Sequence, residues 1–457
     1  METKVAALFL IALIVGVGIG YGIRAATAPA PAATPAPGAP AATVTVTKTV
    51  TKTAPAAPAK GLTGKIKIGA LLALTGELST YGENSKAALE LALSEINKWL
   101  KERGEDWEIE LIIEDTATDP KTCFDKIQIL YGRGVRIVIG PMTSAEVSEV
   151  KKYADANKIL VIAPSSTSPA LSIPGDWIYR YCPDDTIQGP AAARTLLVLG
   201  ARWVVPVWRG DTWGDGVKRE TEEVFKKMLE KAGEEGGFVE GIRYAPGTKE
   251  FSAEAAKLNE IVSGLVEKYG ADKVGIYYVG FEEAVAFVLA CREYDILWKV
   301  AWVGTDGTAQ LAPLAETPEV AEFGWKVKWL HPVFAVAANP IYEKVKNYVI
   351  QKLGREPDPY AYASYDELWS VAIALETLDE YDPEKVKAIL PSILEHYAGA
   401  SGMVILNENG DRAFSDYNLW IVREVSPGKY EWALAGVWHF ATDSVTWEEW
   451  FSEYAPK

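Results

Sequence analysis

The chain has 457 residues, which is too many for one hydrophobic core and predicts two or three domains. Its formal net charge is -16, and the first 64 residues contribute +4 from five basic side chains and one acidic one, which leaves -20 for the remainder. A body this acidic repels phosphate backbones, so we expect no nucleic-acid partner. Three cysteines leave at least one unpaired, which excludes a small disulfide scaffold.

Residues 1–24 are predicted to form a transmembrane anchor or a signal. Residues 5–23 carry no charged side chain, and a run of this length can span a membrane once as a helix. The run is longer than the usual signal core, which favours a retained anchor, while the small residues behind it would suit cleavage. Residues 25–64 are an Ala/Pro/Thr-rich linker that lacks the apolar side chains of a core. We therefore expect an extracytoplasmic globule, held at the membrane or secreted.

From residue 65 onward, short runs rich in Val and Ile alternate with amphipathic stretches. The runs read KIKIGALLAL, WEIELIIED, VRIVIG, KILVIAP and WIYRY, and later WVVPVW, KVGIYYVG and WKVAWVG. Helical patterns are expected between them, at residues 84–99, 120–131, 144–156, 188–199, 216–232 and 282–293. Such alternation is typical of parallel sheets covered on both faces. Because one sheet cannot hold so many units, we predict an α/β fold with two doubly wound parallel-sheet lobes.

Polar groups gather where the expected strands end, which is the edge where such sheets bind ligands. In the first half these ends are rich in hydroxyls, as in GPMTSAE and PSSTSPA. In the second half they carry aromatic side chains and a carboxylate, as in RGDTWGDG, VGFEE and GTDGTA. Hydroxyls and helix amides on one lobe, facing a carboxylate on the other, match the two charges of a free amino acid.

Each of these groups also has a purely structural interpretation. Thr143 and Glu146 fit a capping box at a helix start. The hydroxyl run before Pro169 fits a turn, and Asp306 suits a turn that ends in glycine. The pairing of hydroxyls with a carboxylate on the opposite lobe is what favours a ligand site.

The order and spacing of these segments resemble the amino-acid-binding receptors of ABC importers, the leucine/isoleucine/valine-binding type within the type I periplasmic binding fold. The matching segments are IGALLALTGELSTYG, IIEDTATDPKTC, IVIGPMTSA, ILVIAPSSTSPAL, YRYCPDDTIQGPAAA, WGDG, YYVG, WVGTDG and YASYDELW. The resemblance implies a receptor that captures a free amino acid, branched-chain or otherwise apolar, between two closing lobes. It would deliver this ligand to the permease subunits of an importer, without enzyme activity and without a cofactor.

By this resemblance, the ligand carboxylate and part of the ammonium are held by three hydroxyl residues: Ser144, Ser165 and Thr167. Asp306 is the acidic partner of the ammonium, and the side-chain pocket and cleft are lined by three aromatic residues: Tyr81, Trp213 and Phe281. Position 213 is Trp where tyrosine is frequent in the family, and position 306 is Asp where the best-known members have Glu. The shorter Asp306 requires the ammonium to lie closer or to be contacted through water.

The expected lobes are each built from two stretches and joined by a three-segment hinge. The N-terminal lobe comprises residues 65–183 and 331–414, and the C-terminal lobe comprises residues 184–330 and 415–457. The crossovers are expected near residues 183–184, 328–331 and 410–415.

Other functions stay open at this point. The 16 tryptophans and 21 tyrosines would suit a carbohydrate receptor, because sugars stack on aromatic faces. A receptor for another small carboxylate or amide, or a sensory ectodomain of the same fold, would share the pattern. An enzyme is the weakest alternative, since the sequence contains no HExxH, CxxC, GxSxG or Walker A motif. No metal-binding cluster is expected either.

Overall fold

The structure is a computed structural model that describes residues 61–455. The predicted membrane anchor, residues 1–24, and nearly all of the linker lie outside the described residues. Between residues 61 and 455, no helix is both long enough and apolar enough to cross a membrane.

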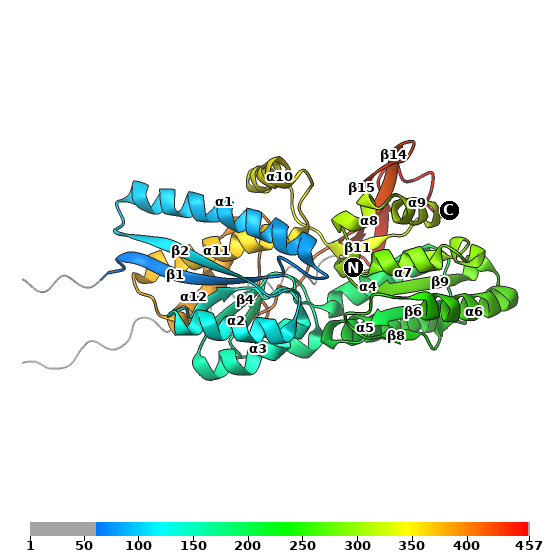
Figure 1. Cartoon of the computed structure of the whole chain (residues 1–457), viewed down its shortest axis with the longest axis horizontal. Coiled ribbons are helices and arrows are strands. Elements are labelled where there is room, and N and C mark those ends of the chain that lie inside the picture. The colour runs from blue at the N-terminus through cyan, green and yellow to red at the C-terminus, as the bar shows by residue number, and fades with distance from the viewer. Residues whose placement is uncertain (1–60, 456–457) are drawn as a thin grey trace, which may run out of the picture. The chain divides into compact units, whose positions relative to one another are not determined.

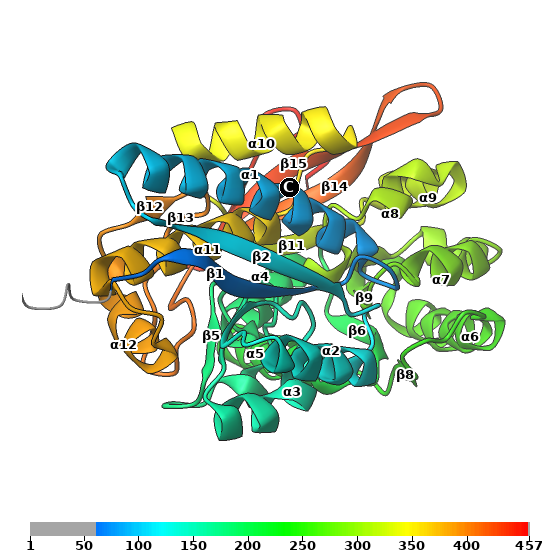
Figure 2. The same cartoon turned by 60° about the vertical axis from the view of Figure 1, so that its left-hand side comes forward.

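The first lobe contains a sheet of five parallel strands in the order β2-β1-β3-β4-β5. Its strands are β1 (Gly64–Leu72), β2 (Trp107–Asp115), β3 (Ile137–Ile139), β4 (Leu160–Ala163) and β5 (Ile178–Arg180). Its helices are α1 (Ser79–Arg103), α2 (Pro120–Gly132), α3 (Ser144–Asn157), α10 (Pro340–Leu353), α11 (Pro359–Leu378) and α12 (Pro383–Leu394). Helices α1 and α11 pack on one face of the sheet, and α2 and α3 pack on the other (Figures 1 and 2). The chain reverses its strand order beside β1, which is where such sheets bind ligands.

The second lobe contains another parallel sheet, in which β9 and β6 are central. Its strands are β6 (Trp203–Arg209), β7 (Gly237–Phe238), β8 (Ile242–Tyr244), β9 (Val274–Val279) and β10 (Ala301–Val303). Its helices are α4 (Asp185–Val198), α5 (Thr212–Ala232), α6 (Ser252–Tyr269), α7 (Ala284–Cys291), α8 (Ala312–Glu316) and α9 (Pro318–Val327). Every residue of β9 is buried, as expected for a strand covered on both faces. The predicted α/β architecture with parallel sheets is confirmed.

A third, antiparallel sheet was not predicted. It is formed by β11 (His331–Phe334), β14 (Tyr417–Ser426), β15 (Lys429–His439) and β16 (Ser444–Trp447). It packs beside α9 and α4 of the second lobe (Figure 1). Its apolar side chains join Leu330 and Phe451 in a small core of their own. A minor antiparallel pair, β12 (Ala398–Gly399) and β13 (Gly402–Met403), lies next to α11.

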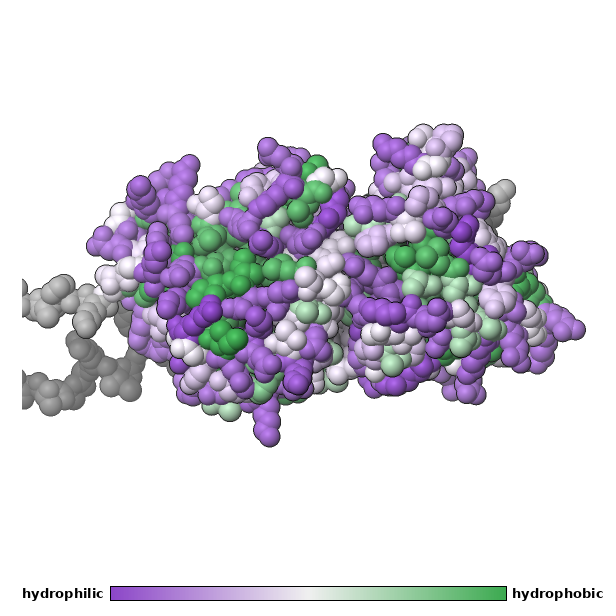
Figure 3. All heavy atoms as spheres, in the orientation of Figure 1, coloured by the Kyte–Doolittle hydropathy of each residue, from purple (hydrophilic) through white to green (hydrophobic). Residues whose placement is uncertain are grey.

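By their packing, β1–β5 and α10–β13 group with the first parallel sheet, and α4–β11 and β14–β16 group with the second, so the chain order alternates between the two groups. Hydrophilic residues cover most of the face seen in Figure 3, with hydrophobic residues gathered in patches on both lobes. This surface agrees with the strongly negative net charge of the chain. The arrangement places the ends of β1, β3 and β4 opposite the ends of β6, β9 and β10.

Candidate functional site

A cavity of about 10 Å³, room for about one water molecule, lies between the two lobes. It is lined by Leu78, Tyr81, Met142, Thr143, Ser144, Ser165, Trp213, Phe281, Asp306, Gly307 and Tyr360. Six of the seven predicted site residues are among them, and the exception is Thr167.

The N-terminus of α3 forms one wall of the pocket. Thr143 caps this helix, because its hydroxyl accepts from the Glu146 amide while the Glu146 carboxylate accepts from the Thr143 amide. The predicted capping box is therefore present. The next residue, Ser144, has its Oγ 3.0 Å from Ser166 Oγ and accepts from the Ser168 amide at 3.1 Å. The hydroxyl and the positive end of the helix together favour an anionic group.

The hydroxyl loop after β4 is held rigidly from behind by Arg180. This guanidinium is fully buried, donates to the carbonyls of Ser166 and Ser168 at 3.0 and 2.8 Å, and forms a two-pronged ion pair with Asp411. Ser165 donates its hydroxyl to the carbonyl of Met142 at 2.6 Å. The loop therefore presents a fixed set of oxygen atoms and amides.

Thr167 takes a different position from the other predicted hydroxyls. It is 2% exposed, does not line the pocket, and its carbonyl accepts from the amide of Asp185 at the start of α4. Its hydroxyl has no hydrogen-bond partner in the described part of the chain. Thr167 is therefore not among the residues that line the pocket.

Asp306 lies on the opposite side of the pocket, in the short 3₁₀ turn of residues 306–308 that follows β10. It is 4% exposed, and its Oδ2 accepts from the hydroxyl of Tyr360 at 2.6 Å. The other oxygen, Oδ1, is buried and has no partner among residues 61–455. Burial raises the pKa of Asp306 to about 6, while the hydrogen bond from Tyr360 acts in the opposite direction. A buried carboxylate with a vacant oxygen is suited to binding a cation or a strong donor.

A second buried acid, Asp185, lies near Asp306. The side-chain amide of Gln188 donates to Asp185 at 2.7 Å, and its oxygen accepts from the backbone amide of Asp306 at 2.9 Å. Burial and then the charge of Asp306 raise the pKa of Asp185 well above its usual value. Both effects disfavour the ionised form of Asp185.

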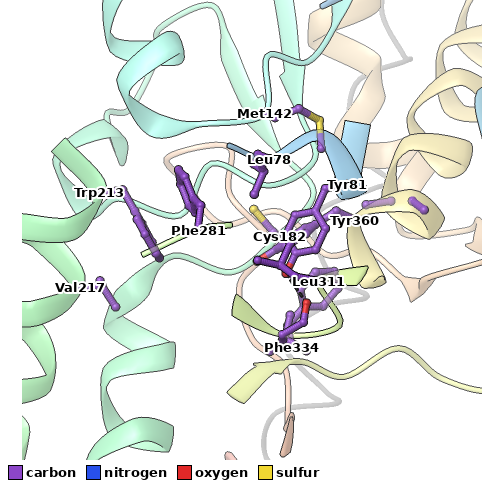
Figure 4. Close-up of a cluster of buried hydrophobic side chains, with 14 of the residues drawn as sticks. Leu78, Tyr81, Met142, Cys182, Trp213, Val217, Phe281, Leu311, Phe334 and Tyr360 are labelled. Carbon is purple, nitrogen blue, oxygen red and sulfur yellow. Dashed lines mark hydrogen bonds between the residues drawn. The ribbon is translucent and has the colours of Figure 1, made fainter. Parts of the chain in front are cut away.

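Aromatic rings close the remaining sides of the pocket. Trp213 and Phe281 stack with centroids 4.8 Å apart, and Figure 4 shows these two rings side by side, opposite Tyr81 and Tyr360. The hydroxyl of Tyr81 donates to the carbonyl of Asp306 at 2.6 Å, so the first lobe already touches the second here. A Cβ atom on Gly307 would lie 2.4 Å from the Trp213 ring, which explains the glycine after Asp306. The wall offers apolar surface to a ligand side chain.

Three lining residues that matter were missed by the sequence reasoning: Leu78, Met142 and Tyr360. Leu78 and Met142 follow expected strands but lack polar groups, so the search for charge-bearing side chains passed over them. Tyr360 comes from the start of α11, distant in sequence from the other lining residues. Its segment belongs to the aromatic stretch PYAYASYDELW, in which the sequence alone does not single out one tyrosine.

The described residues include neither a candidate metal cluster nor an exposed cysteine. Within residues 61–455, no group of three or more His, Cys, Asp or Glu side chains could hold a metal ion. The cysteines Cys123, Cys182 and Cys291 are buried and unpaired, and burial raises the pKa of each thiol well above its usual value. Such thiols are poor nucleophiles. The arrangement can bind a small polar molecule.

Comparisons with known proteins agree with this description. Residues 65–426 match the periplasmic binding protein family. An uncharacterized protein of Methanocaldococcus jannaschii is 31% identical over 84% of this chain and 92% of its own length. A Leu/Ile/Val-binding protein homolog of Brucella abortus is 26% identical over 80% of this chain and 93% of its own.

The fold is similar to that of a leucine-binding protein from Thermotoga maritima, with a TM-score of 0.66 and 24% identity. The comparison covers 81% of this chain and 98% of that protein. Because the family match spans most of the globule, the chain belongs to the family of periplasmic binding proteins and resembles its Leu/Ile/Val-binding members.

Proposed function

We propose that the protein is the extracytoplasmic substrate-binding protein of an ABC importer, and that its ligand is a free amino acid with a branched or otherwise apolar side chain. The observation that carries this proposal is the pocket's pairing of charges. The buried Asp306 carboxylate, with its vacant oxygen, faces the hydroxyls and helix N-terminus at Ser144. Such a pair complements an ammonium and a carboxylate on one small molecule.

In this proposal the ligand carboxylate binds Ser144, Ser165 and the first amides of α3. Its ammonium binds the vacant oxygen of Asp306, and Tyr360 keeps that carboxylate in place. The ligand side chain contacts the ring faces of three aromatic residues: Tyr81, Trp213 and Phe281. Thr167, which was also predicted to bind the ligand, does not line the pocket, so its role is left out of this arrangement.

The aromatic content does not favour a carbohydrate receptor over this proposal. Trp302, Trp329 and Trp438 are buried in the core and do not line the pocket, so they are not available to stack on a sugar there. The names of the relatives, Leu/Ile/Val-binding proteins, support an amino acid as the ligand. These relatives are binding proteins, which supports the expectation that the chain is not an enzyme.

The importer role extends the proposal to partners and location. Permease subunits would receive the ligand from the closed lobes. Residues 1–24 would anchor the protein in the membrane, with the globule outside the cytoplasm, or would be removed as a signal. The globule, residues 65–457, would then be the part that collects ligand.

Identification of the bound ligand tests the proposal. The protein is purified without added ligand, measured by native mass spectrometry, denatured, and its released small molecules are identified. An amino acid that rebinds with one-to-one stoichiometry supports the proposal. A released sugar, or binding of sugars but of no amino acid in a panel of twenty, would refute it.

A further inference from the structure

The long helix α1 begins at the mouth of the cleft, where its own lobe supplies an acceptor, Thr118 Oγ1 at 3.2 Å, to the amide of Leu78. Its N-cap residue is Leu78, which makes no side-chain capping bond, and its first turn contains no acidic residue. The first amides of a helix have no partner within the helix and carry a partial positive charge. The start of α1 therefore needs a further acceptor from elsewhere.

Glu282, in the loop between β9 and α7 of the other lobe, supplies that acceptor. Its carboxylate accepts from the Thr80 amide at 3.0 Å, from the Thr80 hydroxyl at 2.8 Å and from the Ser79 hydroxyl at 3.3 Å. The Glu282 amide also donates to the carbonyl of Glu77 at 3.0 Å. One residue of the second lobe thus closes the helix end of the first.

An ion pair next to this contact also crosses between the lobes. The Glu77 carboxylate lies 3.2 Å from Arg209 and 2.8 Å from Lys249. Arg209 is in turn held at 2.8 Å by Glu283, so its position does not depend on Glu77. Because Glu77, Ser79 and Thr80 are on one lobe and their partners are on the other, every one of these contacts is lost when the lobes separate.

We infer that Glu282 is a closing residue, which caps α1 only when the lobes are together and thereby sets the closed population without touching the ligand. Glu282 is absent from the pocket lining, which distinguishes it from Asp306. The inference depends on the proposed function for the identity of the ligand. The closure of the lobes is argued from the contacts between them and does not depend on that function. The apparent affinity of a protein that binds in its closed form falls in proportion to the closed fraction. Loss of the cap should therefore weaken every ligand by the same factor and leave their ranking unchanged.

The test compares Glu282→Ala with the parent protein, using a panel of amino acids and a fluorescence energy-transfer pair with one dye on each lobe. Removing a cap costs about 1–2 kcal/mol, so we expect roughly 5- to 30-fold weaker binding of each ligand and a shift of the ligand-free protein toward the open form. Glu282→Gln keeps one acceptor oxygen, so its affinities should lie between those of the parent protein and those of Glu282→Ala. Glu293→Ala is the matched control, because Glu293 is exposed on the same lobe and forms no ion pair among residues 61–455.

A double-mutant cycle with Thr80→Ala locates the effect, because residues in contact have non-additive energies. The inference is overturned if Glu282→Ala changes neither the lobe distances nor the affinities more than Glu293→Ala does. It is also overturned if the variant changes the ranking of ligands, since that would place Glu282 in the pocket. If no amino acid binds the parent protein, the proposed function fails, while the lobe distances of the ligand-free variants still decide on the cap.

Discussion

The substitution Asp306→Asn tests whether Asp306 binds a positive charge of the ligand or only stabilises a turn. Asparagine keeps the size of the side chain and can still accept from Tyr360, but it loses the negative charge that would face a ligand ammonium. A charge-assisted hydrogen bond lost in a pocket where Asp306 is only 4% exposed should cost about 2–4 kcal/mol. We therefore expect about 30- to 1000-fold weaker binding of amino acids. A neutral sugar would lose far less, because an amide still donates and accepts hydrogen bonds.

The raised pKa of Asp306 adds a pH dependence to this prediction. Since burial raises this pKa to about 6 in the ligand-free protein, and an ammonium binds the ionised form, affinity should fall as the pH drops below 6. One proton taken up at that pKa weakens binding by up to about 30-fold at pH 4.5 relative to pH 7.5. The Asn variant should lack this step.

The stability of the ligand-free protein changes with pH in the direction opposite to the ligand affinity. An acid whose pKa is higher in the folded protein stabilises it at low pH, and this contribution is lost as the pH rises from about 4 through 6. Without ligand, Asp306→Asn should thus melt at or above the parent temperature at pH 7.5. If Asp306 were only a turn residue, the variant would melt lower and bind normally.

Isothermal titration with leucine, isoleucine and valine at pH 7.5 and 4.5, together with melting curves, measures all these effects. Asp295→Asn is the matched control, because Asp295 is exposed on the same lobe. An amino-acid affinity of Asp306→Asn within threefold of the parent would refute the assignment of this residue.

Further predictions concern the pocket, the lobes and the core. Tyr360→Phe removes the bond that lowers the pKa of Asp306, so the pH step in binding should move above 6 in the same titrations. Saturating amino acid should reduce the radius of gyration in small-angle scattering if the free protein is open; a free protein that binds ligand while staying open contradicts the hinge. Asp411→Asn leaves the buried Arg180 unpaired and should lower the free energy of unfolding by about 3–5 kcal/mol in urea denaturation, whereas a loss below 1 kcal/mol would contradict the ion pair's role. Residues 61–457 alone should fold and bind; an insoluble fragment beside a full chain that binds would contradict this boundary.

The parallel sheets could be predicted because their strands are continuous buried runs of β-branched residues. The antiparallel sheet was missed for a different reason. In β14 the buried and less buried residues alternate for its first five positions, and the Pro427-Gly428 turn joins it to β15. This period-two pattern indicates a hairpin, whereas the alternation of apolar runs with amphipathic stretches indicates only parallel βα units.

The site could be predicted where its residues directly follow strands, as Ser144 and Asp306 do. Which hydroxyls of a consecutive run face the pocket is decided by the backbone path, and for this reason Ser165 lines it and Thr167 does not. The bond between Tyr360 and Asp306 depends on how α11 packs against the cleft. Sequence spacing does not contain that information.

The recognition of two opposite charges on one small ligand is the central claim, and calorimetry with matched analogues tests it most directly. The amino acid that binds best is compared with two analogues, one without the amino group and one without the carboxylate. Because each analogue leaves a buried polar group unpaired, both should bind at least about 100-fold more weakly than the amino acid. An analogue that binds as tightly as the amino acid would contradict the account.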